Sequence, residues 1–322
     1  MVACSSGPDS TCLLDILAKL KDKYNLELIV AHVNYGLRGK DSDLDQKLIE
    51  KYASRYKLKL VVFKPKYLTP ALSLKKERGT KRLLSENKLR ESRYEFFEKV
   101  RRGNRFDSIA VGHTLDDQAE TYLMRIIRGS GLRGMAAMKH KNVYPVKSPQ
   151  SGVGRAEFNR GTIIRPLLGI TKKEILRYLK SNKLSYRTDK SNKEVLYLRN
   201  KIRNELIPLL ENKYNPNIKE TLYKSSLNIA EDYALIEELT EKYYRKHNEL
   251  RVNNILKLHP ALQKRIILKT IENVRPDLKD IVSAHIREVL KIFKSDKSKK
   301  QIVKFQGLKF TRIGDKLAIS HS

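Results

Sequence analysis

Short apolar runs alternate with amphipathic stretches along the first half of the chain. Residues 27–33, 58–64 and 107–112 are apolar runs rich in β-branched residues, which is typical of parallel strands buried on both faces. Between these runs, apolar residues recur at helical spacing, as they do over residues 13–17. This alternation predicts an α/β fold with a doubly wound, mainly parallel sheet. In such a sheet the ligand lies outside the carboxyl ends of the strands.

The second half of the chain has a different pattern. Residues 139–161 are rich in Gly, Ser, Pro and basic residues, which predicts a long loop. A strand followed by a helix is expected over residues 162–179, and the pattern is mostly helical over residues 197–294. The tail alternates well enough for two or three strands, with turns at Gly307 and Gly314.

Two domains are expected from the length of the chain and from this change of pattern. A chain of 322 residues can bury two cores of ordinary size. We place an α/β domain at residues 1–195 and a mostly helical domain at residues 196–322, the latter ending in a short β-hairpin.

Charge is the main feature of the composition. The chain has 67 Lys and Arg residues against 36 Asp and Glu residues, a formal net charge of +31. Such a surface attracts polyanions, although a generally Lys-rich composition is the alternative explanation. The chain shows no apolar run of about 18 residues and no signal-peptide pattern, which argues against a membrane protein. Only two cysteines occur, Cys4 and Cys12, which favours a reducing, cytoplasmic setting.

A small polar segment follows the first apolar residues. The sequence VACSSGPDST (residues 2–11) predicts a strand end, a turn and a helix start, where unpaired backbone N–H groups attract anions. Asp9 would repel phosphates unless a cation lies between them, which suggests Mg²⁺. A capped turn without a ligand remains the alternative. The candidate phosphate-binding residues are Ser5, Ser6, Gly7, Pro8, Asp9 and Ser10.

A second polar segment, GHTLDDQAETYLMRIIRGSG (residues 112–131), follows a predicted strand. Thr114 and Asp117 have the spacing of a capping box, and Gly129 is placed to end the helix. Asp116 and Glu120 lie four residues apart and share one helix face. Ala119, Leu123, Ile126 and Ile127 are expected to form the apolar side. The alternative is a capped amphipathic helix with a solvated acidic start, next to a structural histidine, His113.

The first polar segment resembles the Ser-Gly-Gly-x-Asp-Ser pyrophosphate loop of the N-type ATP pyrophosphatases, with Ser6 at the first glycine position. If that position requires a left-handed backbone, serine costs about 1–2 kcal/mol there. The chain as a whole is similar to the tRNA(Ile)-lysidine synthase family. The matching segments are AHVNYGLRGKDSDLD with Tyr35 for a histidine, SENKLRESRYEFF, GHTLDDQAET with Thr114 for a histidine, IIRPLLGITKKEILRYL, DKSNKEVLYLRNKIRNELIPLL with Asp189, Ser191 and Asn192, and HPALQKRIIL.

The resemblance implies an adenine nucleotide alpha hydrolase-like fold and an ATP-dependent ligase that uses Mg²⁺. Its expected reaction joins free L-lysine to C2 of the wobble cytidine of an isoleucine tRNA with a CAU anticodon, through an adenylated cytidine. The expected catalytic residues are Asp9, Arg90, Arg93, Asp117 and Glu120. His32 and His113 join residues 5–10 as expected ATP ligands, Asp9 and Asp116 are expected metal ligands, and Arg199, Lys201 and Arg203 are expected to bind tRNA.

Several alternatives stay open at this stage. A tRNA-thiolating ATP pyrophosphatase is one, although such enzymes rely on cysteines and Cys4 and Cys12 form no Cys-x-x-Cys pair. A tRNA-binding relative without catalysis is another, because of Ser6 and a first strand that starts only four residues before Ser5. The chain length resembles that of the family's shorter members. The oligomeric state is open, and a homodimer is one option.

Overall fold

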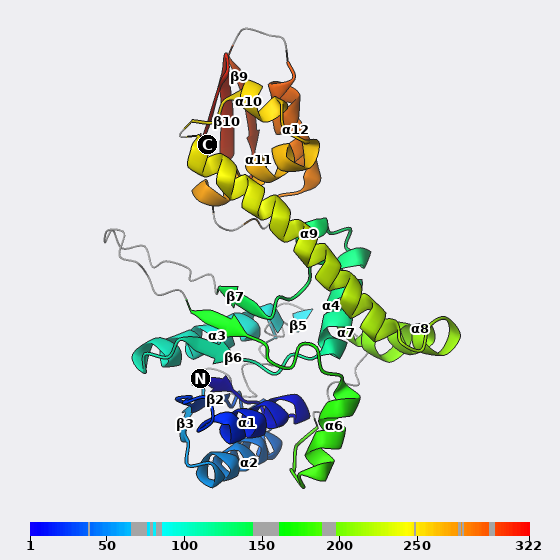
Figure 1. Ribbon diagram of the computed structural model, residues 1–322. Helices are drawn as coiled ribbons and strands as arrows, with labels where there is room; N and C mark the ends of the chain where they lie inside the picture. Colours follow the sequence, from blue (N-terminus) through cyan, green and yellow to red (C-terminus); the bar gives the residue numbers. More distant parts are fainter. Residues whose placement is uncertain are drawn as a thin grey trace. The chain divides into compact units, whose positions relative to one another are not determined.

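The fold is described from a computed structural model, in which contacts divide the chain into two compact units (Figure 1). The first unit comprises Met1–Leu227 and the second comprises Asn228–Ser322. The domain boundary predicted between residues 195 and 196 lies in a stretch outside the described residues and stays a prediction. The structure describes residues 1–37, 39–65, 76–77, 80–81, 86–143, 161–188, 198–247, 249–275, 278, 280–295 and 300–322.

The first unit contains a six-stranded sheet with helices on both faces. The strands of this unit are β1 (Val2–Ala3), β2 (Ile29–Val33), β3 (Lys59–Phe63), β4 (Lys76–Glu77), β5 (Thr80–Lys81), β6 (Ser108–Ala110), β7 (Lys141–Val143) and β8 (Thr162–Ile164). The helices are α1 (Pro8–Leu20), α2 (Lys40–Arg55), α3 (Glu86–Gly103), α4 (Leu115–Ile127), α5 (Leu132–Met135), α6 (Lys172–Ser181), α7 (Leu198–Lys201), a π-helical turn (Ile202–Leu206), α8 (Ile207–Lys213) and the start of α9 (Ile218–Lys246).

The main sheet has the strand order β3-β2-β1-β6-β8-β7. All neighbouring strands pair in parallel except β7, which runs antiparallel to β8 at the edge. Chain order proceeds outward from β1 to β3 in one direction, and from β6 to β8 in the other. The order therefore reverses between β1 and β6, and a doubly wound sheet binds its ligand in the crevice at such a point.

Alternating strand residues bury the sheet on both faces, as the apolar runs predict. Val2, Val30 and Ala110 pack in one core together with apolar residues of α1, α2 and α6. Ile29 and Ile109 point the other way, into a core that apolar residues of α3 complete. The predicted doubly wound, mainly parallel α/β fold is confirmed.

Two expectations from the sequence need correction. The segment over residues 139–161 is not all loop, because β7 lies within it and pairs with β8, which follows it; residues 144–160 are outside the described residues. Ile126 and Ile127 are 45% and 54% exposed, because they occupy the last turn of α4, beyond its buried stretch. The two or three strands expected in the tail are confirmed, since they form a three-stranded antiparallel sheet that is larger than a short hairpin.

The second unit packs helices against that small sheet. Its elements after α9 are α10 (Val252–Leu256), α11 (Pro260–Val274), α12 (Ser283–Phe293), β9 (Gln301–Phe305), β10 (Leu308–Ile313) and β11 (Lys316–His321). Gly307 and Gly314 have φ angles of +74° and +56°, so the two predicted turns use the left-handed backbone that glycine tolerates. The core joins apolar residues of the three helices to Leu308, Phe310 and Leu317 of the sheet.

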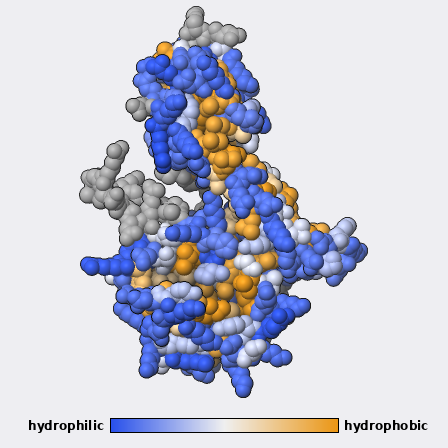
Figure 2. All heavy atoms as spheres, viewed as in Figure 1, coloured by the Kyte–Doolittle hydropathy of each residue, from blue (hydrophilic) through white to orange (hydrophobic). Residues whose placement is uncertain are grey.

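Hydrophilic residues cover most of the face drawn in Figure 2, in keeping with the high content of Lys and Arg. Within the described parts of the chain, we find no helix that combines the length and the apolar character needed to cross a membrane.

Candidate active site

Two loops meet where the strand order reverses. The first is the segment over residues 5–10, here named the serine loop, which connects β1 to α1. The second connects β6 to α4 and contains Gly112 and His113. A Cβ atom on Gly112 would lie 3.0 Å from the backbone carbon of Asp9 and 3.0 Å from the nitrogen of Ser10. The two loops are therefore in direct backbone contact, as their positions after neighbouring strands predict.

Hydroxyl groups hold the serine loop in a closed turn. The backbone N–H of Ser5 donates to Ser10 Oγ over 3.1 Å, and the two serine hydroxyls are 3.2 Å apart. Ser10 Oγ in turn donates to the carbonyl of Gly7, over 3.1 Å. Gly7 is the N-cap of α1 and Pro8 occupies its first turn, where the missing N–H of proline has no cost. The helix N-terminus therefore begins at the loop, as expected of an anion site.

Ser6 has a left-handed backbone, with φ of +68°. Its side chain is buried, at 2% exposure. Its carbonyl accepts a hydrogen bond from the backbone N–H of Arg187, over 3.0 Å, and one from the hydroxyl of Thr11. The Arg187 side chain binds Asp45 and Asp41 of α2, at 2.6 and 2.7 Å. The strained residue is thus held by one nearby residue, Thr11, and by one that is far away in sequence, Arg187.

Asp9 faces a cation from another part of the unit. Its Oδ1 lies 2.5 Å from Nζ of Lys172, the first residue of α6. Burial raises the pKa of Asp9, the ammonium of Lys172 opposes that rise, and the nearby carboxylates of Asp117 and Asp116 add to it. The serine loop therefore already has a positively charged partner at its carboxylate.

The first turn of α4 brings two further carboxylates to the same place. Asp117 closes the predicted capping box, with its Oδ2 accepting from the N–H of Thr114 over 3.0 Å. Asp116 Oδ2 accepts from the backbone N–H of Lys172 over 2.7 Å, and its Oδ1 lies 3.0 Å from Nζ of Lys219. Both oxygens of Asp116 are therefore engaged within the unit.

Glu120 lies one turn further along α4 and is buried, with a side chain 3% exposed. The guanidinium of Arg203 binds it through two hydrogen bonds, of 2.5 and 2.9 Å. Arg199 Nε lies 3.4 Å from the same carboxylate, and Arg199 also donates to the hydroxyl of Thr121. Burial raises the pKa of Glu120, and Arg203 works against that rise. Such a bidentate pair holds the buried group as a carboxylate.

His113 is held as a neutral imidazole. Arg165 Nε donates to its Nδ1 over 3.2 Å, so the ring hydrogen is on Nε2. Burial, together with the positive charges of Arg165, Arg90 and Arg199 and against the effect of Asp117, lowers the pKa of His113 to about 4. A neutral ring with its hydrogen on Nε2 can donate that N–H to a phosphate or a base edge at this edge of the sheet.

His32 and the two arginines of α3 lie beside this cluster in different settings. His32 is buried on β2; its Nδ1 donates to the carbonyl of Cys4 over 2.9 Å, and its Nε2 has no hydrogen-bond partner among the described residues. Arg90 is exposed, 5.1 Å from the ring centroid of Tyr94. Arg93 is exposed and stacks over Tyr35, the residue that replaces a family histidine, at 5.6 Å from its ring centroid.

The structure brings together the residues predicted in the two loops and on α4, and it adds Arg199 and Arg203. Lys201, two residues from each of those arginines, is exposed. Sequence reasoning missed Lys172, Lys219 and Arg165, because each comes from a segment far along the chain whose folding against the loops carries no local pattern. The matched segment IIRPLLGITKK contained two of them, and its position after a strand was the one available signal.

The described residues do not form a complete set of protein ligands for a metal ion. The described residues contain no group of three or more His, Cys, Asp or Glu side chains arranged to hold an ion. Mg²⁺ bound with a nucleotide needs only one or two carboxylates, since phosphates and water supply the remaining ligands. Asp9 fits this requirement. Asp116 would first have to release Lys219 or the backbone of α6.

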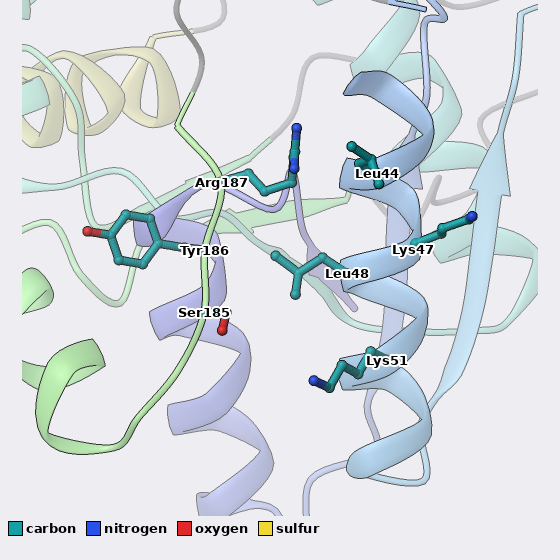
Figure 3. Close-up of a pocket in the computed structure, with 7 residues that line it drawn as sticks. All are labelled: Leu44, Lys47, Leu48, Lys51, Ser185, Tyr186 and Arg187. Carbon is teal, nitrogen blue, oxygen red and sulfur yellow. The ribbon is translucent and has the colours of Figure 1, made fainter. Parts of the chain in front are cut away.

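A pocket of 380 Å³ lies on the other side of the Arg187 contact, between α2 and the segment over residues 185–187 (Figure 3). Leu44, Leu48, Lys47 and Lys51 of α2 line one side, and the segment over residues 185–187 lines the other, with the ring of Tyr186 pointing away from α2 (Figure 3). The acidic residues of α4 do not line it. The chemistry described above therefore belongs to the sheet edge and not to this pocket.

The sheet order, the serine loop and the acidic helix start together define a nucleotide-binding α/β protein of the ATP-pyrophosphatase type. Residues 1–210 match the model of the PP-loop domain. The chain belongs to the PP-loop family.

Similar proteins extend the match beyond the PP-loop domain. The chain is 32% identical over 307 residues to the tRNA(Ile)-lysidine synthase of Clostridium tetani, covering 93% of this chain and 60% of that protein. It is 34% identical over 304 residues to the tRNA(Ile)-lysidine synthase of Geobacter sulfurreducens, covering 92% of this chain and 59% of that protein. The chain thus spans about three fifths of the length of these curated relatives.

Among solved structures, a U34-tRNA thiolase from Methanococcus maripaludis superposes with a TM-score of 0.53. It is 21% identical and the match covers 71% of this chain and 70% of that one. At this level of identity the likeness concerns the fold.

Proposed function

We propose that this protein is an ATP-dependent ligase that joins lysine to C2 of the wobble cytidine in an isoleucine tRNA with a CAU anticodon. The observation that carries the proposal is the similarity to tRNA(Ile)-lysidine synthases, which extends over 93% of the chain at 32% identity. The polar cluster at the sheet edge supplies the groups that such a reaction needs. The match covers 60% of that relative's length, so the activity of the whole protein is part of the proposal.

The first step of the proposed reaction is adenylation. The C2 oxygen of the cytidine attacks the α-phosphorus of ATP, the bond to the β-phosphate oxygen breaks, and pyrophosphate leaves. The N–H groups at the start of α1 and the hydroxyls of Ser5 and Ser10 would hold the pyrophosphate. The guanidinium of Arg90 would stabilise negative charge as it develops, since it is exposed at the same edge and acts electrostatically on His113. Arg93 lies one turn further along α3, and we keep it as a second candidate.

The second step of the proposed reaction is the attack of lysine. The ε-amino group must lose a proton, and its nitrogen then attacks C2 while the C2–O bond breaks and AMP leaves. Asp117 and Glu120 are the candidate anchors for the lysine ammonium. Glu120 is held by Arg203, whereas Asp117 Oδ1 has only a distant contact with that arginine, at 3.5 Å. Asp117 is therefore the better candidate for accepting the proton.

Mg²⁺ is a further part of the proposal. Asp9 would hold it, and when bound the ion would neutralise charge on the phosphates of ATP. The remaining contributions come from the chain itself. The serine loop orients the pyrophosphate, the neutral His113 donates a hydrogen bond from Nε2, and the Glu120–Arg203 pair holds the first turns of α4 in place.

The test is lysine incorporation. Purified protein is incubated with ATP, Mg²⁺, labelled lysine and a transcript of isoleucine tRNA that carries the CAU anticodon. We expect label in this transcript and none in a matched transcript with a changed wobble base. An Asp117→Asn variant keeps the shape of the side chain and should lose most of the turnover. Binding of the CAU transcript without incorporation would overturn the ligase proposal in favour of a tRNA-binding relative without catalysis.

A further inference from the structure

Neither of the two predicted motifs explains the contact between Lys172 and Asp9. Its side chain reaches from the start of α6 to the serine loop and places its ammonium 2.5 Å from Asp9 Oδ1. Its side chain is 36% exposed and that of Asp9 is 26% exposed. Both side chains keep contact with solvent, which screens the ion pair and limits its contribution to stability. Stability alone therefore gives a weak reason for a lysine at this position.

Helix α6 is fixed to the unit by contacts that do not use the Lys172 side chain. Tyr178 donates to the buried carboxylate of Asp15 over 2.5 Å, and Lys19 of α1 donates to Asn182 over 2.7 Å. The apolar residues Ile175 and Leu179 are 1% and 0% exposed in the core. The helix therefore does not depend on the Lys172 ammonium for its position.

The start of α6 is fixed independently as well. Thr171 and Glu174 form a complete capping box, with the backbone N–H of Thr171 donating to Glu174 over 2.8 Å. The backbone N–H of Lys172 donates to Asp116, which fixes the residue's main chain and leaves the ammonium to reach the loop. The backbone is thus held by one carboxylate while the side chain faces another, next to the anion site at the start of α1.

We propose that Lys172 Nζ is a ligand of the terminal phosphates of ATP and of the pyrophosphate product. Before nucleotide binds, Asp9 holds the ammonium over the serine loop; a bound pyrophosphate, with a higher charge than one carboxylate, then takes it over. Both contacts of Lys172 are charge-assisted hydrogen bonds, and pyrophosphate offers more charge and more acceptor oxygens than the single carboxylate of Asp9. The proposal names a further residue of the ATP site and rests on the proposed function only for the identity of the nucleotide.

The test measures ligand binding without tRNA or lysine. Isothermal titration gives the dissociation constants of ATP, pyrophosphate and AMP for the unchanged protein and for a Lys172→Met variant, with Mg²⁺ and with EDTA. We expect the variant to bind ATP and pyrophosphate about tenfold or more weakly under both conditions. AMP lacks the terminal phosphates, so its affinity should change less than twofold. A Lys172→Arg variant should recover most of the lost affinity.

Lys173 provides a matched control, because it is the adjacent lysine on the same helix and is exposed. A Lys173→Met variant loses the same charge and should bind all three ligands normally. Equal losses in both variants would attribute the effect to net charge and overturn the proposal. A parallel loss of AMP affinity in Lys172→Met would indicate a displaced loop and overturn it as well. Since these titrations contain no tRNA, a failed lysine incorporation would leave their outcome interpretable.

Discussion

At the scale of single residues, Ser6 shows how the serine loop obtains its shape. A non-glycine residue at positive φ costs about 1–2 kcal/mol, and the chain accepts this cost beside the start of α1. Arg187 N–H and the Thr11 hydroxyl hold the Ser6 carbonyl in place. Contacts within the chain therefore fix the turn, which reduces the ordering that ligand binding must supply.

Replacing Ser6 with glycine should stabilise the protein. Glycine adopts positive φ without a steric cost, although it also gains freedom in the unfolded chain, so we expect a net gain of about 0.5–1 kcal/mol. Urea unfolding monitored by circular dichroism measures the difference. A Ser6→Ala variant removes the same hydroxyl and keeps the strain, so it should show no gain. Equal stabilities of the glycine and alanine variants would exclude backbone strain as the cause.

His113 should stay neutral well below the pH at which an ordinary histidine is protonated. The groups facing it are Arg165 after β8, Arg90 of α3, Arg199 of α7 and Asp117 of α4. Burial, followed by the three arginines, lowers its pKa from 6.5 to about 4. The unfolded chain takes up a proton as pH falls through 6.5, and the folded chain does so only near pH 4. The stability that comes from the neutral ring is therefore complete above pH 6.5 and is lost progressively down to pH 4.

Nuclear magnetic resonance of labelled histidine side chains measures this pKa directly. A His113→Gln variant provides the comparison for stability, because it cannot titrate at this position. The unchanged protein should lose more stability between pH 7 and pH 5 than the variant does. A measured pKa of His113 near 6.5 would contradict the burial and charge argument.

At the scale of elements, the site depends on how closely the β6–α4 connection approaches the serine loop. Gly112 lies at this approach, with Asp9 and Ser10 backbone atoms 3.0 Å from where a Cβ would be. Backbone atoms cannot move aside as the end of a flexible side chain can. The close approach lets the acidic start of α4 and the start of α1 act on one ligand.

A Gly112→Ala variant should therefore weaken ATP binding. The added methyl group pushes the serine loop away from α4, and overpacking of this kind costs about 1–3 kcal/mol. If the serine loop moves to relieve this strain, the affinity for ATP falls roughly tenfold or more. Titration of ATP measures the loss. Gly131→Ala is the matched control, because a Cβ there would have no atom within 4 Å and its φ is not positive. Normal affinity in the Gly112 variant would show that the loops tolerate separation.

Local patterns in the sequence predicted the elements of the site, but they did not predict which residues from distant parts of the chain contact those elements. The Thr114–Asp117 capping box and the helix end at Gly129 are set by neighbours in the chain, and both are confirmed. Their common location with the serine loop followed from the carboxyl ends of parallel strands. The partners Lys172 and Arg187 lie about 160 to 180 residues away in sequence from the loop, so only the folded chain identifies them.

At the scale of the whole molecule, the charge of +31 predicts strong, salt-dependent attraction to a polyanion. Not every cation of the predicted tRNA-binding set is equally available. Arg203 and Arg199 already face Glu120, whereas Lys201 between them is exposed. Of the three residues, Lys201 is therefore the one whose charge can meet an RNA phosphate without breaking an internal pair.

If tRNA is the partner, its affinity should fall steeply with salt, by roughly 0.7–0.9 log units per phosphate contact for each tenfold rise in salt concentration. A Lys201→Met variant should lower that slope by about one contact and leave the stability of the protein unchanged. Lys51→Met, which removes an exposed lysine from α2, is the control for net charge and should keep the original slope.

Arg203→Met should instead lower the unfolding temperature, because it leaves the buried Glu120 without its bidentate partner. Fluorescence anisotropy of labelled tRNA over a salt series, with melting curves of each variant, separates these effects. If the affinity of the unchanged protein for tRNA does not depend on salt, phosphate contacts do not contribute to tRNA binding. An unchanged melting curve for Arg203→Met would show that the Arg203–Glu120 ion pair does not stabilise the site.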